Sequence, residues 1–183
     1  MALATTYRRR LHERALEAYG YVTTDDATEL GIPQSAMRQI AERGGLTRVA
    51  HGVYRFDDVP TSNRDAYMEA VLAVGGGAHL VGDAVLALHD LGLVNPRRIR
   101  VGTSRRTRRS LPDTIEVVPT KDRAEDITVY EGIPTTSIAR AILDCRGVIM
   151  GERLIDATNE AAQRGLLRRQ EAREVLTALG ART

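Results

Sequence analysis

Residues 21–56 constrain the fold of this chain most, because two short helical patterns are followed there by two short strand patterns. The first helix is predicted to begin at Thr23–Asp26, where threonine hydroxyls cap free N–H groups, and to end at Gly31. The second is predicted to begin at Pro33, because proline lacks the N–H that a first helical residue leaves unused. It ends at Gly44. Two helices joined by a tight turn are therefore expected.

Two strands are predicted behind these helices, at residues 46–49 and 53–56, with a glycine-containing turn between them. A helix-turn-helix followed by such a strand pair is typical of winged-helix domains, whose second helix enters the DNA major groove. We therefore expect residues 1–57 to form a winged helix-turn-helix DNA-binding domain. A further helix, at about residues 7–19, is expected to pack against it.

The second predicted helix has an apolar and a polar face at helical spacing. Its apolar face consists of Pro33, Met37, Ile40 and Ala41. The polar face and the strand pair supply side chains of the types that contact base edges and phosphates. The predicted DNA-binding residues are Gln34, Ser35, Arg38, Arg43, Thr47, Arg48 and His51. Arg38 is expected to face base edges, and Arg48 or His51 to contact phosphate. A helical core without a DNA-binding role is the alternative, since it explains the same apolar positions.

A polar segment around Pro60 is predicted to be a hinge between two domains. The second domain, residues 64–183, is expected to be mixed α+β, with helices at both ends of a small antiparallel sheet, so the whole chain is expected to be α+β. Its strands are predicted at residues 99–101, 115–118 and 127–130. Its helices are predicted at about residues 67–74, 83–91, 136–146, 151–164 and 170–179.

Arginine is concentrated in one part of the second domain. The cluster consists of Arg97, Arg98, Arg100, Arg105, Arg106, Arg108 and Arg109, with no acidic residue between them. Because guanidinium groups bind carboxylates and phosphates bidentately, the cluster is a candidate surface for an acidic partner or for phosphate. A solvated loop is the alternative, because arginine is common in this chain and Lys121 is its only lysine. The formal net charge of +2 argues against nonspecific wrapping of DNA.

The sequence contains no recognisable catalytic or metal-binding constellation. Its four histidines are scattered, and no Cys or His pair has zinc-ligand spacing. His89 lies at a predicted helix end, where a surface or capping residue is expected. The glycine run at residues 75–77 lacks the Lys and Ser/Thr of a phosphate-binding loop, and Glu116 and Lys121 lack the spacing of a metal-nuclease centre. We therefore expect no enzyme activity, no cofactor and no metal.

Cys145 is the only cysteine, so it cannot form an internal disulfide and is predicted to be a buried thiol. The sequence has no apolar run of about eighteen residues, so no membrane span is expected. Residues 1–10 lack the apolar stretch of a signal peptide. A cytoplasmic location is therefore expected.

Three stretches carry a family resemblance. The first is AYGYVTTDDATELGIPQSAMRQIAERGGLTRVAHGVYRF, at residues 18–56. The second, from His79 to Leu93, is a small-residue helical segment that ends in a Leu-Gly corner. The third, from Gly132 to Asp144, contains Gly-Ile-Pro, Ala-Arg and Leu-Asp. Together they resemble the AbiEi antitoxin family over nearly the whole chain.

This resemblance implies an antitoxin and autoregulator of a two-gene toxin–antitoxin operon. Such proteins bind inverted repeats in their own promoter through the winged helix and repress it, while their second domain counteracts a nucleotidyltransferase-like toxin. The implied partners are double-stranded promoter DNA and the cognate toxin. The third stretch also has a purely structural explanation, because Thr136 and Ser137 suit a helix start, and Arg140 and Asp144 suit an i,i+4 ion pair.

Two other functions stay open at this stage. One is a winged-helix repressor that is controlled by a small-molecule ligand and has no toxin partner. It requires an apolar pocket within residues 64–179, and release of DNA on addition of the ligand would identify this function. A small nuclease requires an acidic metal-binding cluster, which the sequence does not supply. Magnesium-dependent DNA cleavage identifies that second function.

Overall fold

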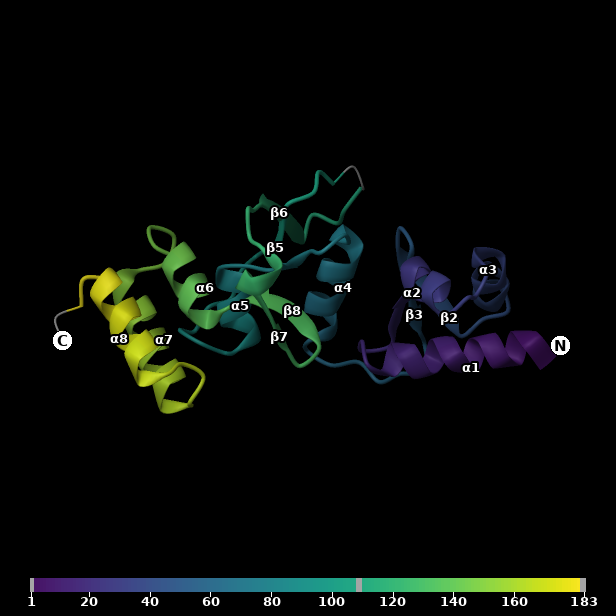
Figure 1. Cartoon of the computed structure of the whole chain (residues 1–183), viewed down its shortest axis with the longest axis horizontal. Coiled ribbons are helices and arrows are strands. Elements are labelled where there is room, and N and C mark those ends of the chain that lie inside the picture. Colours follow the sequence, from purple (N-terminus) through teal and green to yellow (C-terminus); the bar gives the residue numbers. More distant parts are fainter. Residues whose placement is uncertain (1, 108–109, 182–183) are drawn as a thin grey trace. The chain divides into compact units, whose positions relative to one another are not determined.

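The computed structural model describes residues 2–107 and 110–181 (Figure 1). The described residues form two compact units. The first unit comprises residues 2–75 with 110 and 111, and the second comprises residues 76–107 and 112–181. Within these residues, the first unit has a three-stranded sheet and the second a five-stranded sheet. The chain is therefore mixed α+β, as the sequence predicts.

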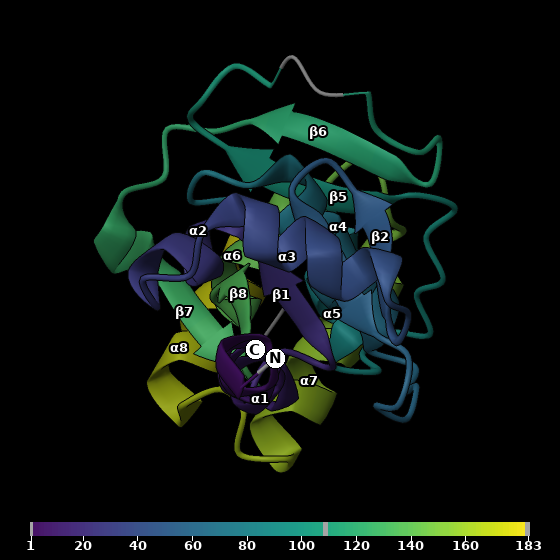
Figure 2. The same cartoon turned by 90° about the vertical axis from the view of Figure 1, so that its right-hand side faces the viewer.

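The first unit combines helices with a small antiparallel sheet (Figure 2). Its elements, in chain order, are α1 (Ala2–Leu16), β1 (Tyr21–Thr23), α2 (Thr24–Glu29), α3 (Gln34–Glu42), β2 (Leu46–Ala50), β3 (Val53–Phe56) and α4 (Asp65–Val74). Strand β3 pairs with β1 on one side and with β2 on the other. The predicted order of two helices and a strand pair is present. Strand β1 is not predicted, because its three residues are too few to display an alternating pattern.

Local hydrogen bonds explain where α2 and α3 begin. Thr23 is the N-cap of α2: its Oγ1 accepts from the Asp26 N–H at 3.0 Å, and the Asp26 carboxylate accepts from the Thr23 N–H at 2.8 Å. Gly31, at φ +65°, follows α2 in the left-handed region that suits glycine. Pro33 is the N-cap of α3, with ψ 140°, rather than its first helical residue. The prediction for Pro33 is therefore wrong by one position.

An apolar core joins the helices of the first unit to its sheet. Phe56 on β3 and Leu11 on α1 have no exposed surface, and Met37 and Ile40 of α3 pack in the same cluster. Burial of each such side chain contributes about 1.5–3 kcal/mol to folding. Pro33 is exposed, so the buried face of α3 is narrower than predicted.

Helix α4 belongs to the first unit, although the sequence analysis places it in the second domain. The Tyr21 hydroxyl on β1 donates to Glu69 Oε2 at 2.8 Å, and Arg55 Nη2 on β3 pairs with Asp65 Oδ2 at 3.0 Å. The division between units falls after Gly75. The predicted hinge therefore lies within the first unit.

The second unit alternates strands and helices. Its elements are β4 (His79–Leu80), α5 (Asp83–Leu88), β5 (Ile99–Thr103), β6 (Ile115–Pro119), the 3-10 helix η1 (Ala124–Asp126), β7 (Ile127–Tyr130), β8 (Ile133–Thr136), α6 (Ile138–Asp144), α7 (Gly151–Gln163) and α8 (Arg169–Ala178). The strand order is β6-β5-β4-β8-β7. The three predicted strands and the predicted helices are all present, with ends that differ by a few residues.

The sheet of the second unit is mixed, so the prediction of an antiparallel sheet is wrong. Strand β5 pairs with β6, and β4 with β8, in parallel, whereas β4–β5 and β7–β8 are antiparallel. The parallel β5–β6 pair forms because the long segment between Thr103 and Ile115 returns the chain to the starting end of β5. Strand β4 is too short to be predicted, and Pro134 obscures β8.

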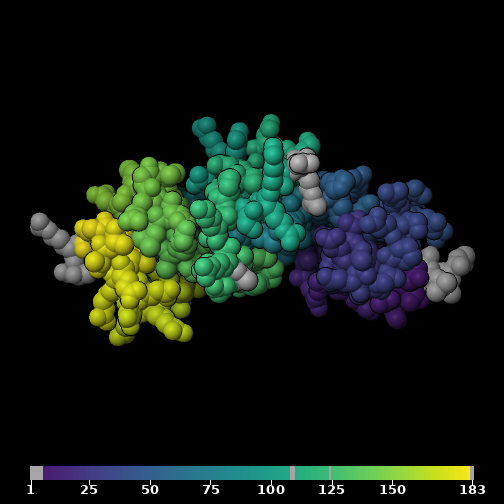
Figure 3. All heavy atoms as spheres, turned by 45° about the horizontal axis from the view of Figure 1, so that its top comes forward, coloured from purple at the N-terminus to yellow at the C-terminus, as the bar shows by residue number. Residues whose placement is uncertain are grey.

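Helices pack on one another in the second unit. Helix α6 contacts both α5 and α8, and α8 also contacts α7. In the space-filling view, the yellow C-terminal helices lie beside the green α6 segment (Figure 3). The fully buried side chains include Leu80, Leu86, Ile133, Ile142 and Leu154. Across residues 2–107 and 110–181, no helix is long and apolar enough to span a bilayer.

The start of α6 and the environment of Cys145 agree with the sequence analysis. The Ser137 hydroxyl accepts from the Arg140 N–H at 3.2 Å, and Arg140 Nε donates to Asp144 Oδ1 at 2.8 Å. Cys145 has no exposed surface. Its burial, together with the nearby Asp83 carboxylate, raises the pKa of the thiol to about 12. Cys145 is therefore an unreactive core residue.

Candidate nucleic-acid interface

Helix α3 presents a polar face to solvent. Met37 and Ile40 are buried on its opposite face, and Ala41 is partly buried. The side chains predicted to contact DNA from this helix, Gln34, Ser35, Arg38 and Arg43, are all exposed. Within the described part of the chain, no carboxylate forms an ion pair with Arg38 or Arg43, so both guanidinium groups are available to an anion.

Two further polar residues share the exposed face of α3 and were missed. Gln39 and Glu42 are both exposed. Helical spacing alone places Gln39 beside Ser35 and Glu42 beside Arg38, so the sequence pattern was sufficient to predict that they share this face. Gln39 carries an amide that can bond a base edge, whereas the Glu42 carboxylate repels phosphate and accepts from cytosine amino groups. The polar face therefore has mixed charge rather than being uniformly basic.

The start of α3 has free backbone donors. Pro33, its N-cap, makes no side-chain capping bond. The N–H groups of Ala36 and Met37 donate to Pro33 O at 2.9 and 3.3 Å. The N–H groups of Gln34 and Ser35 have no hydrogen-bond partner among the residues described. Free donors at the positive end of a helix dipole favour an anion such as phosphate.

The β2–β3 hairpin carries the other three predicted contacts. Thr47, Arg48 and His51 are all exposed. Arg48 Nε donates to Ala50 O at 3.3 Å, next to an irregularity in the β2–β3 register between Arg48 and Ala50. The hairpin tip is held on α2, because the Thr24 N–H donates to Gly52 O at 2.9 Å. The tip of the hairpin is therefore hydrogen-bonded to the start of α2 within the first unit.

Two arginines of α1, Arg8 and Arg14, contact other elements of the first unit. Arg8 Nη1 donates to Gly44 O at 3.2 Å, and its guanidinium lies 5.3 Å from the centre of the Phe56 ring. Arg14 Nε donates to Asp26 Oδ1 at 2.8 Å. Arg8 also contacts Gly45, where an added Cβ would lie 2.8 Å from Arg8 Nη2. These arginines connect α1 to the ends of α3 and α2.

The predicted arginine surface of the second unit divides into different environments. Arg97, Arg98, Arg105 and Arg106 are exposed. Arg100 is partly buried on β5, with its Nη2 3.4 Å from Glu116 Oε1 and its Nε 4.0 Å from Asp83 Oδ1. Arg108 and Arg109 lie outside the described residues. Arg100 thus contributes to packing between strands, whereas its exposed neighbours face solvent.

The histidines do not assemble into one site. His89 is the C-cap of α5, which agrees with the capping alternative of the sequence analysis, and it is buried, with its ring 3.8 Å from that of Tyr130 rather than at the surface. His12 lies 3.3 Å from Asp58, and His79 is buried beside Asp122 at 3.1 Å. Among the described residues, no group of three or more His, Cys, Asp and Glu side chains is arranged to hold a metal ion.

No protein-family model and no curated protein matches this chain. Among solved structures, the chain is similar to the Rv2827c protein from Mycobacterium tuberculosis, with 19% identity and a TM-score of 0.47. The similarity covers 96% of this chain and 78% of that protein. It is too distant to indicate a function.

Proposed function

We propose that this chain is a sequence-specific regulator that binds double-stranded DNA through a winged helix-turn-helix formed by residues 1–57. In this arrangement α2 and α3 are the two helices, α3 enters the major groove, and the β2–β3 hairpin is the wing. The order α1-β1-α2-α3-β2-β3 and the antiparallel β1-β3-β2 sheet support the proposal.

The observation that carries the proposal is the exposed face of α3. Gln34, Ser35 and Arg38 project to solvent from the first two turns of the helix, and the N–H groups of Gln34 and Ser35 have no partner in the described part of the chain. Amide and guanidinium groups read adenine and guanine edges, while free N–H groups and hydroxyls bind phosphate. Arg48 and His51 extend the same chemistry onto the wing, where contact with the backbone of the DNA is expected.

The family resemblance of the sequence is the basis for a proposed biological role. We propose that the protein represses its own promoter at inverted repeats and acts as the antitoxin of a nucleotidyltransferase-like toxin. Inverted repeats require two copies of the DNA-binding unit in related orientations. The exposed arginines Arg97, Arg98, Arg105 and Arg106 supply a candidate surface for the toxin.

The DNA-binding proposal is tested with the DNA upstream of the protein's own reading frame. At fixed salt concentration, Arg38→Ala should cost about 1–3 kcal/mol, or roughly 5- to 150-fold in affinity, and should relax sequence preference. Arg48→Ala should weaken binding to all sequences alike. Arg173→Ala, an exposed arginine on α8, is the control and should bind as the wild type does. Equal operator affinity for the wild type and Arg38→Ala would refute base reading by α3.

A further inference from the structure

Strand β7 lies at one edge of the five-stranded sheet, on the outer side of β8 (Figure 2). Edge strands expose backbone N–H and C=O groups, and proteins commonly protect them with charged residues, proline or irregular pairing. Two other edge strands have such protection: β2 has a register irregularity after Arg48, and β6 contains Glu116 and Pro119. The four residues of β7 are Ile, Thr, Val and Tyr, and they pair with β8 in regular register. The edge of β7 therefore lacks these protective features.

The β7–β8 hairpin determines which backbone groups of β7 face away from β8. Its turn, residues 131–132, has φ values of 48° and 82° and is flanked by the register pair Tyr130–Ile133. In such a two-residue turn the flanking pair exchanges both backbone hydrogen bonds, and bonded and non-bonded pairs then alternate along the strands. The next pair, Val129–Pro134, is therefore non-bonded, which agrees with the missing N–H of proline. The N–H and C=O groups of Val129 thus point away from β8.

The outward groups of Val129 are available to another strand. Within residues 2–107 and 110–181, neither its N–H nor its C=O has a hydrogen-bond partner. The carbonyl of Ile127, two residues earlier, faces the same way. The Val129 side chain is 64% exposed, so this part of the strand is open to solvent. The strand is held in place by Tyr130, whose ring lies 3.8 Å from that of His89 at the end of α5.

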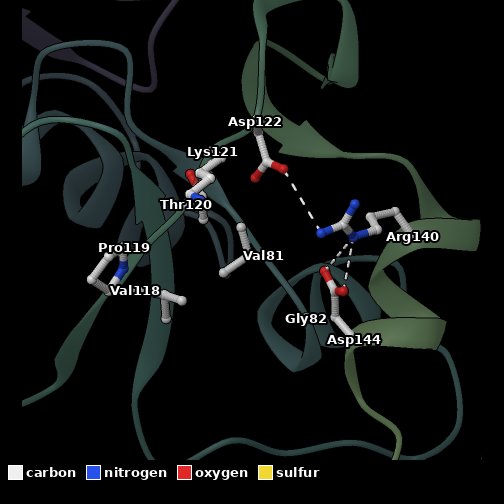
Figure 4. A pocket seen from close by; sticks show the side chains of 9 residues that line it. All are labelled: Val81, Gly82, Val118, Pro119, Thr120, Lys121, Asp122, Arg140 and Asp144. Carbon is white, nitrogen blue, oxygen red and sulfur yellow. Dashed lines mark hydrogen bonds and ion pairs between the residues drawn. The ribbon is translucent and has the colours of Figure 1, made fainter.

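Two carboxylates near the entry to β7 have basic partners within the second unit. Asp122 lies 3.1 Å from His79 Nε2. Arg140 lies between Asp122 and Asp144, with its Nη2 3.9 Å from Asp122 Oδ1 and its Nε donating to Asp144 Oδ1 at 2.8 Å (Figure 4). These contacts fix the segment before β7. They also use the charges of both carboxylates internally.

The acidic residues that directly flank β7 are exposed to solvent. Glu125 and Asp126 precede the strand, and Glu131 follows it. Arg123 is the basic residue of segment 123–131, and its Nη1 lies 3.5 Å from Glu125 Oε1. The two side chains of this pair are 79% and 68% exposed, so their attraction is weak. The two ends of the edge therefore carry net negative charge.

These charges distinguish between two occupants of the edge. A second copy of the chain, related by two-fold symmetry, would pair its own β7 antiparallel to this one. That pairing would bring Glu125 and Asp126 of one copy towards Glu131 of the other, and like charges across a strand pair are destabilising. An extended segment with basic residues at its ends would instead meet opposite charge at both ends of β7.

We propose that the β7 edge binds an extended, basic segment of a partner protein by addition of a strand to the sheet. One residue of that segment exchanges both backbone hydrogen bonds with Val129, and its second neighbour donates its N–H to Ile127 O. Basic side chains beyond these residues pair with Glu125, Asp126 and Glu131. The site lies within the second unit and does not depend on the proposed DNA-binding role.

The proposal is tested on the full-length, ¹⁵N-labelled protein. In the free protein, the Val129 N–H should exchange with solvent at least about tenfold faster than the Thr128 N–H, which faces β8. The probe is the capped hexapeptide Lys-Thr-Val-Thr-Val-Lys. It should bind with a dissociation constant below about 1 mM, shift the amide signals of Ile127 and Val129, and slow Val129 exchange at least about fivefold at saturation. The same peptide with glutamate in place of both lysines should bind at least about fivefold more weakly.

Variants assign the binding to the proposed groups. Val129→Pro removes the outward N–H without removing a bond to β8, and it should weaken the lysine peptide at least about tenfold. Val129→Thr keeps the N–H and is the matched control, with binding within about twofold of the wild type. Glu125→Gln with Glu131→Gln should reduce the preference for the lysine over the glutamate peptide.

Four results would each overturn the proposal. They are no binding of the lysine peptide up to about 5 mM, equal binding of the two peptides, unchanged binding by folded Val129→Pro, and self-association of the free protein that protects the Val129 N–H. If Val129→Pro does not fold, the exchange of Val129 in the wild type decides. Exchange that the bound peptide leaves unchanged at Val129 would then exclude addition of a strand at this edge.

Discussion

Arg55 and Asp65 form a largely buried ion pair that ties the end of β3 to the start of α4, with Nη2 and Oδ2 3.0 Å apart. Arg55 Nη2 also donates to Val59 O at 2.9 Å, and the other Asp65 oxygen accepts from the Ser62 N–H and hydroxyl. The segment around Pro60 is thus bonded at both ends. It resembles a structured connection more than the free hinge that its polar, proline-containing sequence predicts.

Asp65→Ala should therefore destabilise the first unit. Because the side chains of Arg55 and Asp65 are 14% and 11% exposed, removal of one partner leaves a poorly solvated charge, and we expect a loss of about 2–4 kcal/mol. Chemical denaturation of the full chain measures it. Asp57→Ala, at an exposed position in the same segment, is the control and should change stability by less than about 0.5 kcal/mol.

The contacts of α4 also predict where the first unit can be cut. A fragment of residues 1–75 retains the Arg55–Asp65 and Tyr21–Glu69 contacts, whereas a fragment of residues 1–60 loses both. The longer fragment should unfold cooperatively at a higher temperature than the shorter one, because it keeps α4 packed on β1. Circular dichroism melting of both fragments provides the measurement. Equal melting temperatures would mean that α4 adds no stability to this unit.

The sequence predicts local elements well where a single residue type has a strong local effect. Thr23, Gly31 and Ser137 mark helix ends because caps and left-handed turns depend on near neighbours. The polar face of α3 follows from helical spacing in the same way. The strand order and the parallel pairing of β4 with β8 depend on contacts distant in sequence, which no local pattern encodes.

The same distinction explains what was missed around the candidate sites. Arg100 and Arg97 are both members of one arginine cluster in sequence, but only the fold brings Glu116 and Asp83 to Arg100. Asp122 likewise lies 3.1 Å from His79 and 3.9 Å from Arg140, two residues that are distant from it in the sequence. The residues on either side of Arg100 or Asp122 in the sequence do not predict these contacts, because the partners come from other parts of the chain.

Asp26 should make the first unit sensitive to acid. Burial raises the pKa of this carboxyl, but hydrogen bonds from Thr23 and Arg14 outweigh it, so the folded-state pKa lies below the ordinary value of 3.8. Its stabilisation is therefore present above that value and is lost as the pH falls below it. Asp26→Asn should cost about 1–2 kcal/mol at pH 7 and clearly less at pH 3. Urea unfolding at both pH values tests this, and a cost that does not change with pH would contradict it.

Asp83 should have the opposite pH dependence. Burial raises the pKa of its carboxyl, and the charge of Arg100 only partly opposes this effect. Ionisation is therefore less favourable in the folded than in the unfolded state, and its contribution to stability falls as the pH rises through the ordinary carboxyl range. Asp83→Asn should be as stable as the wild type or more stable at pH 7, with a smaller advantage at pH 3. A marked loss of stability at pH 7 would show that the ion pair with Arg100 dominates.

The exposed arginines provide the test of the antitoxin role. Arg97 and Arg98 face solvent, and in the described part of the chain no carboxylate pairs with either. If an acidic surface of the toxin binds there, Arg97→Glu with Arg98→Glu should abolish protection of cells that express a neighbouring nucleotidyltransferase-like gene. Growth of co-expressing cells is the measurement, with circular dichroism to establish that the variant is folded.

A matched change of charge on another surface separates binding from net charge. Arg169→Glu with Arg173→Glu alters two exposed arginines of α8 by the same amount and should leave protection intact. Equal loss of protection in both double variants would mean that overall charge, rather than the Arg97–Arg98 surface, determines the effect. Two reversed charges at a bound surface cost several kcal/mol. If the folded Arg97→Glu, Arg98→Glu variant still protects cells, the Arg97–Arg98 surface does not bind the toxin, and the alternative of a solvated loop is supported.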